Sequence, residues 1–276
     1  GFGVITFPFA YGDDSTSLDQ PEHAHWLGCD WQTDAQQSLN AISGTVDWIV
    51  VDHYALDHRW ETKMREKCAR IMCIDDLADR PHDCDLLLDQ SLGRCSQDYT
   101  TLVPEHAKLL IGPKYALLRP EFAKWRDTSL ARRETPQLGH ILVTMGGVDA
   151  DNVTSHVLTA LQGSDLATLD NITVVLGPHA PWREHVTKQA ADMPVPTQVL
   201  SGVDNMAELM AKCDLAIGAG GSTTWERCAL GVPSILIILA ENQRNIGRSL
   251  HQSGAAFVID GDKPFRSQIR DSLRRC

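Results

Sequence analysis

The sequence has no long hydrophobic run. Its longest apolar stretch, Val232 to Ala240, is interrupted by Pro233 and Ser234, whereas a membrane-spanning helix needs about 20 predominantly apolar residues. Basic residues are also few, since 25 Lys and Arg stand against 36 Asp and Glu and give a formal net charge of −11. A surface that binds nucleic acid is usually basic. We therefore expect no membrane or nucleic-acid partner, no signal peptide, a cytoplasmic location and a monomer.

Closely spaced metal ligands are lacking too. The eight cysteines include no C-x-x-C pair, so they are expected to be free thiols in a reducing compartment. His23, His25 and Cys29 could form a metal cluster, but zinc sites usually have a fourth ligand and closer spacing. Asp75 and Asp76 follow a predicted strand and are interpreted mainly as loop-shaping carboxylates, with a cation site as the alternative. We expect no metal ion and no cofactor.

Two common nucleotide-binding motifs are absent. The pattern G-x-G-x-x-G does not fit, because Gly218 and Gly220 would need a third glycine where Thr223 stands, and there is no Walker P-loop. Residues 218–226 read G-A-G-G-S-T-T-W-E instead and follow the apolar run 215–217. A strand that ends in glycines and restarts as a helix points several unpaired backbone N–H groups at one place, where the helix dipole favours an anion.

The side chains of this turn favour a nucleotide. Ser222, Thr223 and Thr224 add hydroxyl donors, and the glycines before them allow a phosphate to approach the backbone closely. Glu226 would repel a phosphate, so its carboxylate is expected to accept hydrogen bonds from neutral hydroxyls such as a ribose diol. The alternative is an ordinary strand-to-helix turn capped by Ser222 or Thr223.

Strands and helices alternate regularly in the second half of the chain. Repeated strand, helix, strand units predict a parallel sheet covered on both faces, as in a Rossmann-like domain. The predicted strands are 141–145, 172–176, 198–200, 215–217, 234–239 and 256–259, with helices between them.

The first half is similar in kind but less regular. Its predicted strands are 4–9, 48–51, 70–74 and 85–88, and its predicted helices are 34–42 and 57–68. The polar stretch Lys124 to Gln137 contains three arginines and a proline and is the predicted linker. We therefore expect two Rossmann-like domains, residues 1–130 and 131–276, with ligands bound in a cleft between them.

Several loops are expected at the carboxyl ends of these strands. In the second half they are residues 146–149, the turn at Gly220, and residues 240–243, whose two amide side chains could orient a sugar hydroxyl or a water. In the first half, His53 and Tyr54 follow a strand and are candidates for substrate contact or proton transfer. The neighbouring Asp52 is open to either a catalytic or a turn-forming interpretation.

Taken together, six motifs resemble a known family. They are V-D-H-Y at 51–54, I-D-D at 74–76, G-P-K-Y-A-L-L-R at 112–119, M-G-G-V-D at 145–149, G-G-S-T-T-W-E at 220–226 and E-N-Q at 241–243. In order and spacing they are similar to the UDP-2,4-diacetamido-2,4,6-trideoxy-β-L-altropyranose hydrolases of pseudaminic acid biosynthesis. A more distant resemblance is to the peptidoglycan glycosyltransferase that adds N-acetylglucosamine to a lipid-linked acceptor. Both resemblances imply the GT-B fold, in which two Rossmann-like domains with parallel sheets face a central cleft.

The resemblance implies a metal-independent hydrolysis in which water displaces UDP from the anomeric carbon with inversion. The catalytic residues implied are Tyr54 and Asn242, both lining the sugar pocket. The implied substrate-binding residues are Glu226 at the ribose, Gly220, Gly221, Ser222 and Thr223 at the pyrophosphate, the turn from Val203 to Asn205 at the uracil, and Gly146, Gly147, Asp149 and Gln243 around them.

One part of the family pattern is missing. The general base of the family is a histidine in a glycine-rich loop after the first strand, and none of the eleven histidines follows such a turn near the N-terminus. The N-terminal domain is therefore expected to be incomplete, and the chain to bind UDP but turn over poorly. A UDP-sugar glycosyltransferase and a nucleotide-binding module without catalysis remain the alternatives.

Overall fold

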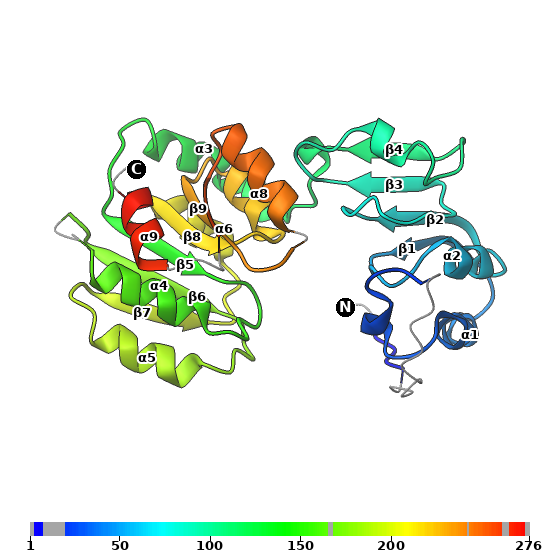
Figure 1. Cartoon of the computed structure of the whole chain (residues 1–276), viewed down its shortest axis with the longest axis horizontal. Coiled ribbons are helices and arrows are strands. Elements are labelled where there is room, and N and C mark those ends of the chain that lie inside the picture. Colours follow the sequence, from blue (N-terminus) through cyan, green and yellow to red (C-terminus); the bar gives the residue numbers. More distant parts are fainter. Residues whose placement is uncertain (1–2, 8–19, 165–167, 242, 261–264, 274–276) are drawn as a thin grey trace. The chain divides into compact units, whose positions relative to one another are not determined.

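The structure is a computed structural model that describes residues 3–7, 20–164, 168–241, 243–260 and 265–273 (Figure 1). The chain divides into two compact units, Gly1–Ala116 and Leu117–Cys276. Each unit contains one sheet, and every strand pair in both sheets is parallel. No helix among the described residues is long and apolar enough to span a bilayer.

The first unit contains a four-stranded sheet with the order β1-β2-β3-β4. Its helices cover one face, where Leu39, Trp60, Ile71 and Leu87 form a buried core. The elements are η1 (Ala24–Leu27), α1 (Trp31–Ala41), β1 (Val46–Val51), α2 (His58–Met64), β2 (Cys68–Ile74), β3 (Leu86–Asp89), η2 (Ser96–Tyr99), β4 (Lys108–Ile111) and η3 (Pro113–Tyr115).

Aspartates fix where α1 and α2 begin. Asp30 accepts a hydrogen bond from Thr33 N (2.8 Å) at the start of α1, and Asp57 accepts one from Arg59 N (2.9 Å) at the start of α2. Each carboxylate satisfies an N–H group that has no partner within its helix. The side chains of Trp48 and Val50 on β1 are exposed.

The second unit contains a six-stranded sheet with the order β10-β9-β8-β5-β6-β7. Helices and strands alternate along the chain (green to red in Figure 1). The elements are α3 (Pro120–Arg132), β5 (His140–Thr144), α4 (Val153–Gln162), β6 (Asn171–Leu176), α5 (Arg183–Ala191), β7 (Thr197–Ser201), α6 (Met206–Lys212), β8 (Leu215–Ala219), α7 (Thr223–Ala229), β9 (Ser234–Ile238), α8 (Gln243–Gln252), β10 (Phe257–Asp260) and α9 (Phe265–Leu273).

Both faces of this second sheet are covered. Ile141 and Val143 on β5 pack in one core with residues of α4, α5 and α9. Leu142, between them in the sequence, packs in another core with Phe122 of α3 and Met210 of α6. Successive strand residues point to opposite faces, so this continuous apolar strand serves two cores. The prediction of a parallel sheet covered on both faces is confirmed for this unit.

Three expectations from the sequence differ from the structure. Residues 4–7 of the predicted first strand are not in a strand, and residues 8 and 9 lie outside the described part. The strand β4 was not predicted. Most of the expected linker at 124–137 is helix α3, which contacts α6 and α7, so the division lies after Ala116 rather than after residue 130. α3 is mostly polar, but it buries Phe122 and donates from Ser129 Oγ to Leu230 O (2.7 Å).

Candidate functional site

The strand order of the second unit identifies its switch point. From β5 the chain continues to β6 and β7 on one side, and it returns to β8, β9 and β10 on the other side. The loops that follow β5 and β8 therefore diverge at the carboxyl edge of the sheet. In open parallel sheets, ligands bind in the crevice at this position.

The predicted phosphate turn follows β8 at this switch point. Gly220 is buried, whereas Gly221 and Ser222 are exposed. The helical hydrogen bonds begin with Thr224 N to Gly221 O (2.9 Å) and Trp225 N to Ser222 O (3.1 Å). The first N–H groups of a helix have no partner within it, and they lie at a solvent-exposed turn. Ser222 is the N-cap residue but its side chain makes no capping bond, so capping by Ser222 does not explain the turn.

The loop after β5 packs closely on the loop after β6. Gly146 has φ of 89°, a conformation that favours glycine. A Cβ atom on Gly177 would lie 1.7 Å from Gly147 O, so the two backbones touch at a position that only glycine allows. Asp149 accepts hydrogen bonds from Val153 N (2.8 Å) and Thr154 N (3.0 Å). Both of its carboxylate oxygens therefore hold the start of α4, and its predicted contact with substrate stays a prediction.

The loop after β9 lies against the phosphate turn. A Cβ atom on Gly220 would lie 3.2 Å from Gln243 Cβ and 3.3 Å from Gln243 Oε1. The same Oε1 accepts a hydrogen bond from Leu239 N (2.9 Å), which fixes the amide of Gln243 beside the turn. Asn242, the other predicted amide, lies outside the described residues.

Glu226 and Val203 come from two further segments of this edge. Burial raises the pKa of the Glu226 carboxyl, and the positive charges of Arg119 and Arg227 oppose that shift. A half-buried carboxylate near the phosphate turn is consistent with an acceptor for neutral hydroxyls. Val203 follows β7 after Gly202, which has φ of 63°, and it is partly buried.

The second unit thus brings most of the predicted binding residues to one edge. Loops after β5, β7, β8 and β9 supply them, and each loop begins where a strand of the parallel sheet ends. Contact between these loops could not be deduced from spacing alone. The sequence analysis also missed Arg227, a charged residue that is only 1% exposed. In the sequence, Arg227 is only a basic residue near the end of a short helix, which does not indicate burial.

The first unit holds Tyr54 in a polar and aromatic cluster. The Tyr54 hydroxyl donates to Asp76 Oδ1 (2.7 Å), and the Arg80 guanidinium lies 5.9 Å from the centre of its ring. The rings of His23 and Trp26 lie 5.6 and 5.8 Å from that of Tyr54. Burial raises the pKa of Asp76, and the hydrogen bond from Tyr54 opposes this shift. Tyr54 is partly exposed, so this cluster has aromatic and polar groups that could meet a sugar.

The residues next to Tyr54 have mainly structural roles. Asp75 is buried and accepts hydrogen bonds from Arg80 Nη1 (2.8 Å), Ala78 N (2.9 Å) and Tyr99 Oη (2.9 Å). Its interpretation as a loop-shaping carboxylate is therefore confirmed. His53 Nδ1 accepts from Ala55 N (3.1 Å), and burial lowers the pKa of its imidazole. The neighbouring Asp52 is exposed.

One group within the described part of the chain could hold a metal ion by proximity alone: Glu61, Cys73 and His82, all buried. Glu61 Oε1 lies 2.7 Å from His82 Nδ1 and 3.1 Å from Cys73 Sγ. Ligand atoms around a tetrahedral zinc ion with bonds of 2.0–2.3 Å lie about 3.3 Å or more apart. The observed distances are those of hydrogen bonds, so the cluster is a polar network that ties α2 to β2.

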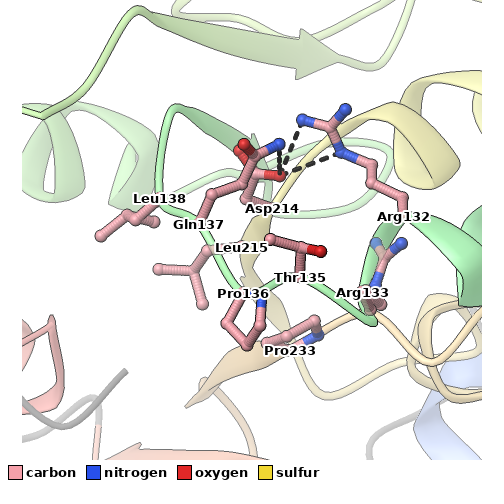
Figure 2. Close-up of a pocket in the computed structure, with 9 residues that line it drawn as sticks. All are labelled: Arg132, Arg133, Thr135, Pro136, Gln137, Leu138, Asp214, Leu215 and Pro233. Carbon is pink, nitrogen blue, oxygen red and sulfur yellow. Dashed lines mark hydrogen bonds and ion pairs between the residues drawn. The ribbon is translucent and has the colours of Figure 1, made fainter.

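A cavity of about 280 Å³ lies at the opposite edge of the second sheet (Figure 2). It is lined by residues just before β5, β8 and β9, so it is remote from the switch point. Asp214 in its wall binds Arg132 Nη2 (2.8 Å) and accepts from Gly139 N (2.9 Å) and His140 N (2.8 Å). These contacts join α3 to the start of two strands, and we assign the cavity no role in binding the nucleotide.

The second unit corresponds to a known type of domain. Residues 140–275 match the model of the Glycosyltransferase family 28 C-terminal domain. The chain also resembles the crystal structure of Acinetobacter baumannii MurG, with a TM-score of 0.58 and 16% identity over 89% of this chain and 67% of that chain. This likeness, together with the two parallel sheets, shows a GT-B-like fold. How the two sheets face each other stays a prediction.

Two curated relatives cover most of the chain. An uncharacterized protein of Methanocaldococcus jannaschii, MJ1062, is 29% identical over 79% of this chain, which spans only 45% of that protein's length. The UDP-2,4-diacetamido-2,4,6-trideoxy-beta-L-altropyranose hydrolase of Campylobacter jejuni is 25% identical over 75% of this chain and 71% of its own length. The chain is thus similar to a hydrolase of the predicted kind, but at low identity.

Proposed function

We propose that the protein acts on a UDP-linked diacetamido-trideoxy sugar and hydrolyses it, releasing UDP with inversion at the anomeric carbon. The observation that carries this proposal is the exposed turn at Gly221 and Ser222, which lies at the switch point of a sheet that matches a glycosyltransferase domain. A preorganised group of backbone N–H donors stabilises charge as it develops on a leaving group. UDP is such a leaving group, so stabilising its charge contributes more than protonating it.

The proposed roles follow the chemistry of each residue. The N–H groups and hydroxyls of residues 220–223 bind the diphosphate, Glu226 accepts from the ribose diol, and the turn at 203–205 holds the uracil. Gly146 and Gly147 offer backbone groups beside the diphosphate, and Gln243 orients a sugar hydroxyl or a water. Asp149 acts by holding this loop in place.

The first unit is proposed to bind the sugar. Tyr54 donates to Asp76, and this pair can exchange that bond for one with a sugar hydroxyl or an acetamido oxygen. Tyr54 and Asn242 are the residues proposed to contact the reacting sugar. Water also needs a general base, and no described histidine is assigned that role.

A direct test uses the chain and the altropyranose nucleotide as substrate. Released UDP is measured by a coupled assay, and the anomeric configuration of the first product is read by proton NMR before mutarotation. Inverted free sugar supports the proposal. If the chain binds UDP but releases none from the substrate even at high protein concentration, hydrolysis is contradicted. The chain would then be a nucleotide-binding module.

The second candidate is a glycosyltransferase that uses the same UDP site. It is favoured by the match of residues 140–275 to a glycosyltransferase domain. Adding candidate acceptors to the same assay separates the two activities. UDP release that requires an acceptor, with a glycosylated product detected by mass spectrometry, would assign transfer instead of hydrolysis.

A further inference from the structure

Arg227 is a buried cation whose hydrogen-bonding capacity is only partly used. Its Nη2 donates to Ala219 O (2.9 Å) and to Thr224 Oγ1 (3.1 Å). Its Nε and Nη1 atoms are buried and have no hydrogen-bond partner among the residues that the structure describes. A guanidinium has five N–H donors in a rigid plane, so several of them are left unpaired here.

The guanidinium lies against the end of β8, next to the phosphate turn. A Cβ atom on Gly218 would lie 2.3 Å from Arg227 Nη1 and 2.7 Å from Thr144 O. Gly218 is in β8 and Thr144 ends β5, so the charge sits at the switch point between these two strands. Glycine at 218 is required because any side chain would occupy the place of the guanidinium.

No carboxylate of the described residues forms an ion pair with Arg227. Burial lowers the pKa of its guanidinium to about 10, and the negative charge of Glu226 opposes this shift. Arg227 therefore keeps its proton at neutral pH. A buried charge without a counter-ion is costly, and in a medium of low dielectric its field is also strong.

We propose that Arg227 is the fixed positive charge behind the phosphate turn and that the diphosphate of the bound nucleotide is its counter-ion. This inference rests on the proposed nucleotide site and adds a selectivity to it. The exposed N–H groups of the turn contact the phosphates, and the buried guanidinium favours the ligand with more negative charge. Arg227 is thus a positioning residue that makes the site prefer a nucleoside diphosphate over a monophosphate or a nucleoside.

The competing explanation is purely structural. In that case Arg227 serves only to tie α7 to β8 through Ala219 O and Thr224 Oγ1, and its loss disturbs the turn for every ligand alike. The two explanations differ in how the effect depends on ligand charge.

The test compares Arg227→Met, which removes the charge, with Arg227→Lys, which keeps it. Arg133→Met is the control, because Arg133 is an arginine of intermediate burial that donates to the carbonyls of Met210 and Cys213 at the opposite edge of the sheet. Dissociation constants for uridine, UMP and UDP are measured by calorimetry at two salt concentrations. The melting temperature of each unligated variant is measured as well.

We expect Arg227→Met to weaken the binding of UDP at least tenfold, that of UMP less, and that of uridine by no more than twofold. Arg227→Lys should stay within threefold of the wild type for UDP, and Arg133→Met should change no affinity. An equal loss for all three ligands, or no loss for UDP, overturns the inference. If the wild type binds uridine and UMP as tightly as UDP, the inference about Arg227 fails while the proposed nucleotide site stands. If the wild type binds none of the three ligands, both the inference and the proposed site are overturned.

If Arg227→Met does not fold, the wild type still provides a test. The Nε–Hε resonance of Arg227 is followed by NMR during titration with UDP and, separately, with uridine. A shift with UDP and none with uridine supports the inference. The same response to both ligands, or none to UDP at saturation, contradicts it.

Discussion

Gly177→Ala should disturb the proposed nucleotide site, although Gly177 itself is not assigned to the ligand. Gly177 follows β6, and a Cβ atom there would lie 1.7 Å from Gly147 O. Non-bonded heavy atoms are normally about 3.5 Å apart. The substitution must therefore move the backbone at Gly147, or its own loop, by about 2 Å.

The size of the effect follows from this displacement. Overpacking of this kind usually costs about 1–3 kcal/mol of folding free energy. The loop that contains Gly146 and Gly147 is proposed to lie beside the diphosphate, so a shift of this loop should also weaken the binding of UDP. We expect the dissociation constant of UDP to rise about tenfold, which corresponds to about 1.4 kcal/mol.

Gly163→Ala is the matched control. Gly163 follows α4 with φ of −89°, and a Cβ atom there would lie 3.8 Å from the nearest atom, Ala160 O. Urea unfolding and calorimetry with UDP are carried out on both variants. Equal stability and equal affinity for Gly177→Ala and the wild type would refute the close contact between the two loops. A loss of stability without a loss of affinity would remove the Gly146 loop from the nucleotide site.

Three further substitutions test other parts of the structure. Glu226→Ala should weaken the binding of UDP by about 1–3 kcal/mol, because the ribose hydroxyls lose their acceptor. Calorimetry should find the binding of inorganic pyrophosphate unaffected. An equal loss of affinity for both ligands would contradict the ribose contact. Glu61→Ala should lower the free energy of unfolding by about 1–3 kcal/mol for each buried donor it leaves unpaired, as measured by urea titration, and a change below about 0.5 kcal/mol contradicts the network with His82. Tyr54→Phe should raise the pKa of Asp76 further above its ordinary value, since the hydrogen bond that lowers this pKa is lost. If an NMR titration finds the same Asp76 pKa in the variant and the wild type, the hydrogen bond is refuted.

The second sheet could be predicted from the sequence because most of its strands are mainly apolar. Residues 141–145 and 234–238 are buried, and such runs stand out between polar helices. The short strand β4 was missed because its four residues, K-L-L-I, begin with a charge and are only partly buried. Helix α3 was taken for a linker because it buries few side chains, chiefly Phe122 and Ser129.

The candidate site was only partly predictable, for a different reason. A glycine turn after an apolar strand is a local signal, so the positions of Gly146 and Gly220 were available from the sequence. The contacts around those glycines are made with segments that lie far away in the sequence. Gly177 against Gly147 and Gln243 against Gly220 each depend on the order of strands in the sheet, which local patterns do not contain.

The two units have different roles in the proposed reaction. Nucleotide binding can therefore be tested separately from the choice of acceptor. Every group proposed to bind UDP comes from the second unit, and hydrolysis and transfer need that set equally. Substitutions at Arg227 or Glu226 should therefore change both activities in the same proportion. The group that decides between water and an alcohol acceptor must act on the other side of the anomeric carbon. In the first unit the candidates surround Tyr54, where Asp76 is held partly desolvated and with a raised pKa, so the choice between hydrolysis and transfer should be sought there.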